Sequence, residues 1–234
     1  HYPGGRAPEL LEIVDAYLRR PAKLLRPRIL LLSARRYQQT LAEEPLLELA
    51  AATELLHVFA LMHDDRIDRD GRAGVELPTS EGLGAYLVLA GDLLHTLSIG
   101  MIEECLATHQ LDRRISRWVR RVSCNTIAGQ AADVRFLQEG STPDMEALYE
   151  LYDLKTGYYS FVAPLVIGAL AVGAGEEETA SLEAVGLLLG RAFQLRDDEA
   201  DLRNRMEEKG NSKIASWELN LLASLEGNRG DDAR

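Results

Sequence analysis

The sequence predicts an all-α protein, a single-domain helical bundle, and three observations lead to this expectation. Apolar residues recur at three- and four-residue spacing along almost the whole chain, which is the period of an amphipathic helix. No stretch sustains the alternation of apolar and polar residues that is typical of a half-buried strand. Prolines are few, 8 in 234 residues, and most stand at the edges of apolar segments. Because no linker or repeat divides the chain, one domain is expected over residues 1–234.

The predicted helices follow one another closely. Leu10, Leu11, Val14 and Leu18 form the stripe of a first short helix, which Pro21 separates from the next. Longer apolar patterns predict helices over 23–37, 45–68, 81–109, 113–137, 144–174, 177–205 and 215–225.

Two of the predicted boundaries carry a chemical signal. The segment 69–80 is rich in Gly, Arg and Asp, and it is expected to be a loop. Thr142, Pro143 and Asp144 predict the start of the helix over 144–174. Threonine caps the free N–H groups, proline is tolerated at the first position, and an acid favours the positive end of the helix dipole.

Composition restricts the partners and the compartment. A net charge of −11 argues against nucleic acid, which requires a basic surface. Cys105 and Cys124 are too few for a disulfide framework and favour a reducing, cytoplasmic location. The uncharged run 157–175 approaches the length of a membrane span. Its glycines, proline and tyrosines favour a helix buried in the bundle instead, so no transmembrane segment is expected.

Two acidic D-D-x-x-D motifs end apolar helical runs, and they comprise Asp64, Asp65, Asp68, Asp197, Asp198 and Asp201. Asp64 and Asp68 share one helix face, where like charges cost about 0.2–0.5 kcal/mol. A divalent cation favours such a pair, because Mg²⁺ binds one or two carboxylates and completes its shell with water and phosphate oxygens. A lone motif is more often a solvated helix end, but two copies predict a metal–diphosphate site between two helices.

Six motifs in this order resemble those of the trans-isoprenyl diphosphate synthases, the polyprenyl synthetase family: KLLRP, ELLHVFALMHDDRID, GDLL, GQAAD, KT and FQLRDDEAD. The resemblance extends from Lys23 to Asp201. It implies an isoprenoid synthase-type bundle around a deep central cavity, usually a homodimer. It also implies a Mg²⁺-dependent enzyme that condenses isopentenyl diphosphate with an allylic diphosphate. The product would be a linear trans-prenyl diphosphate of geranylgeranyl or nearby length.

The resemblance also assigns roles to individual residues. The six aspartates would bind several Mg²⁺ ions that bridge the allylic diphosphate. Lys155 and Gln194 would lie beside that diphosphate, with Gln130 and Thr156 near the reacting carbons. Gln130 and Asp133 are three residues apart and therefore share a helix face.

The second diphosphate, that of isopentenyl diphosphate, would be held by cations without a metal. The resemblance places Lys23, Arg26, His57 and Arg72 at this site. One departure concerns Ala73, which stands where the family has the second of two tandem arginines. One diphosphate-binding arginine is therefore missing.

Product length is expected to depend on Phe59, five residues before Asp64 and about 7 Å further along the helix axis. A large aromatic residue here, with the small Ala60 beside it, resembles the arrangement that forms geranylgeranyl diphosphate. Plain core packing accounts for Phe59 equally well on the pattern alone.

Two alternatives remain at this point. A class I terpene cyclase also ionises an allylic diphosphate, but its second motif is generally of an Asn/Ser/Glu type, and here the sequence reads DDEAD. A non-catalytic subunit of a heteromeric prenyl synthase would agree with Ala73, whereas six intact aspartates argue against it.

Overall fold

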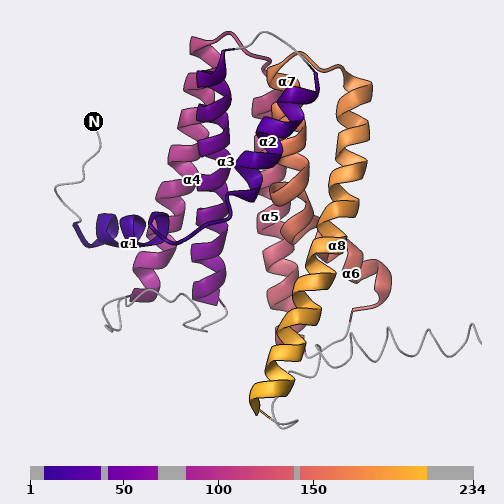
Figure 1. Cartoon of the computed structure of the whole chain (residues 1–234). Helices are drawn as coiled ribbons and strands as arrows, with labels where there is room; N and C mark the ends of the chain where they lie inside the picture. Colours follow the sequence, from indigo (N-terminus) through magenta and orange to yellow (C-terminus); the bar gives the residue numbers. More distant parts are fainter. Residues whose placement is uncertain (1–7, 38–41, 68–82, 140–142, 210–234) are drawn as a thin grey trace, which may run out of the picture.

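The computed structural model describes residues 8–37, 42–67, 83–139 and 143–209, and every element in these ranges is a helix (Figure 1). The elements are α1 (Pro8–Leu18), α2 (Leu25–Arg36), α3 (Glu43–Ile67), α4 (Leu83–Thr108), α5 (Arg114–Glu139), α6 (Met145–Tyr152), η2 (Asp153–Val162), α7 (Ala163–Ala171) and α8 (Glu176–Lys209). The all-α prediction is confirmed. The predicted loop over 69–80 and the predicted helix over 215–225 lie outside the described residues.

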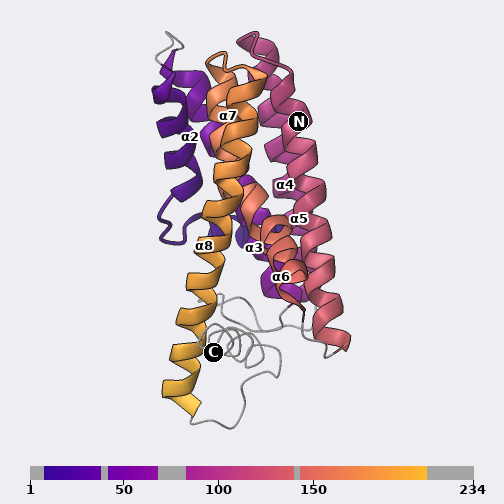
Figure 2. The same cartoon turned by 90° about the vertical axis from the view of Figure 1, so that its right-hand side faces the viewer.

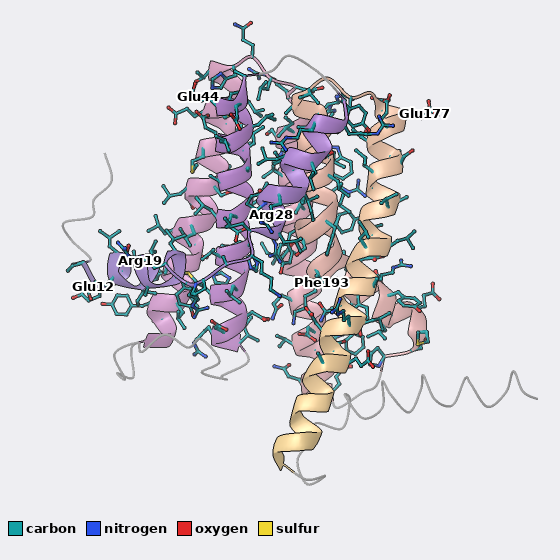
Figure 3. The ribbon with its side chains drawn as sticks, in the orientation of Figure 1. Glu12, Arg19, Arg28, Glu44, Glu177 and Phe193 are labelled. Carbon is teal, nitrogen blue, oxygen red and sulfur yellow. The ribbon has the colours of Figure 1, made fainter. Side chains whose placement is uncertain are left out.

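The long helices run up and down along a common bundle axis (Figure 1). Glu44 and Glu177 mark the end of the bundle at which α3 and α8 both begin (Figure 3). α4 packs along α3, α2 packs on α7, and α5 and α8 both contact η2. α1 lies across the bundle and contacts α4 (Figure 1). In the view turned by 90°, α8 lies in front, with α2 to one side and α5 to the other (Figure 2).

Burial follows the helical period of the sequence. On α3 the residues Leu49, Ala52, Leu56, Phe59 and Met62 are buried, at spacings of three and four residues. α7 is different, because almost all of its residues are buried. An all-apolar helix is typical of the centre of a large bundle, and this is the place that the sequence predicted for the run 157–175.

In the part of the chain that the structure describes, three helices are long and apolar enough to cross a membrane on length and composition alone: Glu43–Ile67, Gly84–Thr108 and Met145–Ala171. In the most apolar window of the last of these, 72% is buried inside the bundle.

The region 144–174 differs from its prediction as a single α-helix. Its middle, η2, is a ten-residue π-helix between α6 and α7. The predicted cap at Thr142 is also wrong. The N-cap is Asp144, whose carboxylate accepts a hydrogen bond of 2.8 Å from the Ala147 backbone N–H. Aspartate caps a helix as well as threonine does, so a shift of the cap by two residues keeps the same chemistry.

Two glycines let α5 and α8 approach η2 closely. A Cβ on Gly129 of α5 would lie 2.4 Å from a backbone nitrogen of η2, and a Cβ on Gly190 of α8 would lie 2.5 Å from an η2 Cα. The next residue, Arg191, donates hydrogen bonds of 2.8 and 2.6 Å to the carboxylate of Asp153. η2 is therefore held between α5 and α8, and π-helical turns are frequent at functional sites.

Candidate active site

The first acidic motif meets two helices through Asp64, in the last turns of α3. Gln130 of α5 donates a hydrogen bond of 2.8 Å to Asp64 Oδ1. The Lys155 ammonium of η2 lies 3.4 Å from the same oxygen and 2.5 Å from Asp133 Oδ2. Gln130 and Asp133, which were predicted to share one face of α5, therefore lie toward the first motif. The Lys155 ammonium bridges the carboxylates of Asp64 and Asp133.

The second acidic motif is connected to η2 by the residue after this lysine. The hydroxyl of Thr156 donates a hydrogen bond of 2.8 Å to Gln194 of α8, and the Gln194 amide donates one of 2.8 Å to Asp198. Tyr152 donates a third, of 2.5 Å, to the other oxygen of Asp198. Burial and the charge of Asp198 raise the pKa of Tyr152 well above its usual value, so this phenol remains a donor. Asp197 is exposed.

Asp65 has a different environment from its neighbour Asp64. Its carboxylate accepts a hydrogen bond of 2.7 Å from the hydroxyl of Tyr17, and the Arg20 guanidinium lies 3.4 Å away. Arg20 also stacks over the Tyr17 ring, 3.7 Å from its centroid. Consecutive residues on a helix point about 100° apart, so one carboxylate turns toward α5 and the other toward α1. Asp65, predicted as a metal ligand, is placed where it anchors α1.

Arg26 is the buried member of the predicted cation site. Arg26 of α2 is 9% exposed, and its guanidinium donates a hydrogen bond of 2.7 Å to the Ser160 hydroxyl. The Tyr159 ring lies 5.1 Å from the guanidinium carbon and stacks on His57 at 5.9 Å. Burial and the nearby charge of Arg26 lower the pKa of His57 to about 3, so its ring is neutral. Lys23 is exposed, in the turn before α2.

Among the residues that the structure describes, three polar atoms at this cation site are buried without a hydrogen-bond partner: Arg26 Nε, His57 Nδ1 and Glu54 Oε2. Burial raises the pKa of Glu54, while the charge of Arg26 opposes this. Unpaired buried donors are costly, commonly about 1–3 kcal/mol each. A guanidinium with a free N–H beside a ring nitrogen is therefore suited to an anion with several acceptor oxygens, such as a diphosphate.

Phe59 is buried one to two turns from Asp64 on the interior of the bundle. Its ring contacts His63 edge-on at 5.0 Å and the His95 ring of α4 at 4.8 Å. The side chain fills the space between α3 and α4 beside the first acidic motif.

Several predicted residues fall outside this description. Asp68 and Arg72 lie outside the described residues, as does Ala73, and the side chain of Asp201 is not described. Other contacts were missed by the sequence analysis, namely those made by Tyr17, Arg20, Tyr152, Tyr159 and Ser160. None of these belongs to a recognisable motif. The one signal available was that the tyrosines of 152–159 adjoin Lys155 and Thr156.

Comparisons with known proteins show the family to which this chain belongs. The family model for polyprenyl synthetase matches residues 7–216. The chain is 38% identical over 182 residues to a geranylfarnesyl diphosphate synthase of Aeropyrum pernix, covering 75% of this chain and 56% of that protein. It is 32% identical over 216 residues to a geranylgeranyl diphosphate synthase of Sulfolobus acidocaldarius, covering 89% of this chain and 63% of that protein.

Solved structures share the fold. A geranylgeranyl pyrophosphate synthetase of Geoglobus acetivorans superposes with a TM-score of 0.71 at 30% identity, covering 82% of this chain and 62% of that one. A geranylgeranyl pyrophosphate synthetase of Pyrococcus horikoshii superposes with a TM-score of 0.69 at 28% identity, covering 84% of this chain and 59% of that one. The chain thus spans little more than half the length of several of the proteins it matches. Because the family model covers every described helix, the chain belongs to the polyprenyl synthetase family.

Proposed function

We propose that this chain carries the active site of a trans-prenyltransferase, which joins isopentenyl diphosphate to an allylic diphosphate and extends a linear prenyl chain. The observation that carries this proposal is the pair of adjacent η2 residues, since Lys155 contacts the first acidic motif and Thr156 contacts the second through Gln194. The relatives named as geranylfarnesyl, geranylgeranyl and farnesyl diphosphate synthases support it.

The aspartates at this junction suit Mg²⁺, whose preferred ligands are carboxylate, water and phosphate oxygens. The ligands we propose are Asp64, Asp68, Asp197, Asp198 and Asp201, with Asp65 holding the end of α3 against α1. When bound, Mg²⁺ neutralises negative charge on the leaving diphosphate. The Lys155 ammonium adds a positive charge at the same place, and Gln194 adds an amide donor. Both stabilise the departing diphosphate, so ionisation to an allylic cation is favoured.

The second diphosphate would bind beside the buried Arg26 guanidinium and the neutral His57 ring. Arg26 Nε and His57 Nδ1 have no hydrogen-bond partner among the described residues and are available to phosphate oxygens. Exposed Lys23 would close the site from solvent, and Arg72 is proposed to complete it. The double bond of isopentenyl diphosphate then attacks the allylic cation, and the departing diphosphate accepts the proton that is lost. Gln130 and Thr156, both on the junction, would line the path of the reacting carbons.

The size of the product would be limited by Phe59, which is 5% exposed and packed against α4. An elongating chain that enters between α3 and α4 meets this ring beside the first motif. We propose a geranylgeranyl product or one of neighbouring length.

We further propose a homodimer formed from one domain over residues 1–234. Large apolar side chains are exposed on the adjoining helices α4 and α5, namely Val88, Leu89, Leu97 and Ile127. A second copy would cover them. The helices long enough to span a membrane would then belong to the core of a cytoplasmic protein without a transmembrane segment.

The proposal is tested by incubating the purified chain with Mg²⁺, isopentenyl diphosphate and, in turn, dimethylallyl, geranyl and farnesyl diphosphates. The products are dephosphorylated and identified by mass spectrometry. A linear prenyl alcohol is expected, and it should be lost in the Asp64→Ala/Asp197→Ala variant. Glu177→Gln, which removes an exposed carboxylate at the far end of α8, is the matched control and should retain activity.

Two other outcomes would contradict the proposal. A cyclic hydrocarbon formed without isopentenyl diphosphate would make the chain a terpene cyclase. Diphosphate binding without any product would make it a non-catalytic subunit.

A further inference from the structure

A carboxylate, a thiol and an imidazole meet at the end of the bundle remote from the acidic motifs. Glu48 lies in the second turn of α3, one turn after Glu44, which marks this end in Figure 3. Cys105 is in the last turn of α4, and His109 follows that helix directly. The donor atoms of these three side chains all lie within 4.8 Å of one another. Among the described residues, no other group of three or more His, Cys, Asp or Glu side chains is placed in this way.

The backbone holds two of these side chains in register. The His109 N–H donates a hydrogen bond of 3.0 Å to the Cys105 carbonyl, so the helical hydrogen-bond pattern continues one residue beyond α4. Residues four apart on a helix lie on the same face. Gln110 then adopts a left-handed conformation, with φ of 52°, which ends the helix just beyond the pair. α3 packs along α4 and presents Glu48 to this face.

The contacts among the three side chains are close but leave room for an ion. His109 Nε2 lies 3.8 Å from Glu48 Oε2. The Cys105 thiol is 1% exposed and donates to the Pro45 carbonyl at 3.6 Å. The side chains of Glu48 and His109 are 41% and 23% exposed, so one direction remains open to solvent.

We propose that Glu48, Cys105 and His109 bind a zinc ion, at a site separate from the magnesium site and independent of the prenyl-transfer reaction. Thiolate, imidazole and carboxylate are the three ligand types of Zn²⁺, at about 2.0–2.3 Å. In a tetrahedral site such ligand atoms lie about 3.5 Å apart. The observed separations therefore need side-chain shifts of about 1 Å, and a water completes the tetrahedron from the exposed side.

Charge and proton balance agree with this assignment. The carboxyl end of α4 carries the negative end of a helix dipole, which favours a cation there. On binding, the Cys105 thiol gives its proton to solvent as the sulfur–zinc bond forms, and no electron is transferred. The ion would tie the start of α3 to the end of α4. The competing arrangement is a hydrogen-bonded trio with a protonated thiol and no metal.

Cobalt(II) is the probe that separates these two arrangements, because a cobalt–thiolate bond produces an intense near-ultraviolet charge-transfer band, whereas cobalt bound to aspartates does not. The full chain is titrated with Co²⁺ in the presence of excess Mg²⁺, which occupies the acidic motifs. The wild type and Cys124→Ser should develop the band, and Cys105→Ser should lose it. Cys124 is the matched control, since it is exposed on α5. His109→Ala and Glu48→Gln should weaken binding by roughly tenfold or more.

The absence of a band in the wild type, or its survival in Cys105→Ser, would overturn the site. Unchanged affinity in both His109→Ala and Glu48→Gln would overturn it equally. Because Cys105 is buried, the folding of Cys105→Ser is also checked by circular dichroism. If Cys105→Ser does not fold, His109→Ala and Glu48→Gln provide the test. As a second readout, Zn²⁺ should raise the melting temperature of the wild type and of Cys124→Ser but not that of His109→Ala.

Discussion

At the scale of single residues, Asp64 and Asp65 differ most from what their shared motif suggests. Asp64 meets Gln130 and Lys155, whereas Asp65 is bonded to Tyr17 at 2.7 Å. The two negative charges are tolerated side by side because the Asp64 carboxylate and the Asp65 carboxylate each have their own hydrogen-bond donors. One acidic motif therefore serves the junction with η2 and the attachment of α1.

Removal of the Lys155 charge should affect chemistry more than folding. We expect Lys155→Met to lower kcat by about 10²–10³, because the ammonium stabilises charge on the departing diphosphate. Lys155→Arg should restore part of the rate, since it keeps the charge. Steady-state kinetics with a saturating allylic diphosphate measures both variants.

Arg19→Met is the matched control for this experiment. Arg19 is exposed directly after α1 and pairs only with Asp15 among its described contacts. Its kcat should stay at the wild-type value. An unchanged kcat in Lys155→Met would remove the lysine from the proposed mechanism.

The buried His57 should make the protein less stable in acid. Burial and Arg26 hold its folded-state pKa at about 3, below the ordinary value of 6.5. Between these two pH values the unfolded chain binds a proton that the folded chain does not. The free energy of unfolding therefore falls as the pH falls through this window, by at most about 1.4 kcal/mol per pH unit from this group.

His57→Gln should remove this contribution and flatten the dependence of stability on pH. Denaturant unfolding of both proteins at several values between pH 7 and pH 4 measures the difference in slope. Equal slopes would show that His57 does not resist protonation in the folded state.

At the scale of elements, η2 connects the two acidic helices. Its π-helical turns lie between α5 and α8, and it carries Lys155 and Thr156 toward opposite motifs. The close approach of the flanking helices depends on residues without a side chain. This makes helix spacing, and not only side-chain identity, a determinant of the site.

Gly190→Ala should therefore destabilise the protein by about 1–3 kcal/mol, because the added Cβ would meet the η2 backbone at 2.5 Å. Gly100→Ala is the matched control. It also lies within a long helix, but its Cβ would have no atom within 4 Å. The control should be neutral or more stable by up to about 1 kcal/mol, as alanine favours a helix over glycine. Thermal unfolding compares the two, and equal effects would contradict the spacing argument.

At the scale of the whole molecule, the exposed apolar side chains of α4 and α5 predict self-association. Leu89 and Leu97 are eight residues apart and lie on one face of α4, with Ile127 exposed on α5. Leu89→Glu should shift the proposed dimer to monomer, because a charge would be buried at the proposed interface. Sedimentation velocity measures the change. Leu188→Glu, at an exposed leucine of α8, is the control and should leave the proposed dimer intact.

The sequence by itself determined the all-α class, the order of the helices and the family. Helical hydrogen bonds and amphipathic periodicity are local, so they can be read from neighbouring residues. The same holds for the face shared by Gln130 and Asp133. The bounds of α3 and α4 fall within two residues of those predicted.

Only the tertiary structure decided what each site residue contacts. The partner of Asp65 is 48 residues away, and the partner of Arg26 is 134 residues away, so no local pattern specifies either pair. The π-helical form of η2 is equally hidden, because its sequence is compatible with an α-helix and its geometry accompanies close packing against α5 and α8. The burial that lowers the pKa of His57 and the meeting of Glu48 with His109 arise in the same way, from helices that pack together although the residues are distant in the chain.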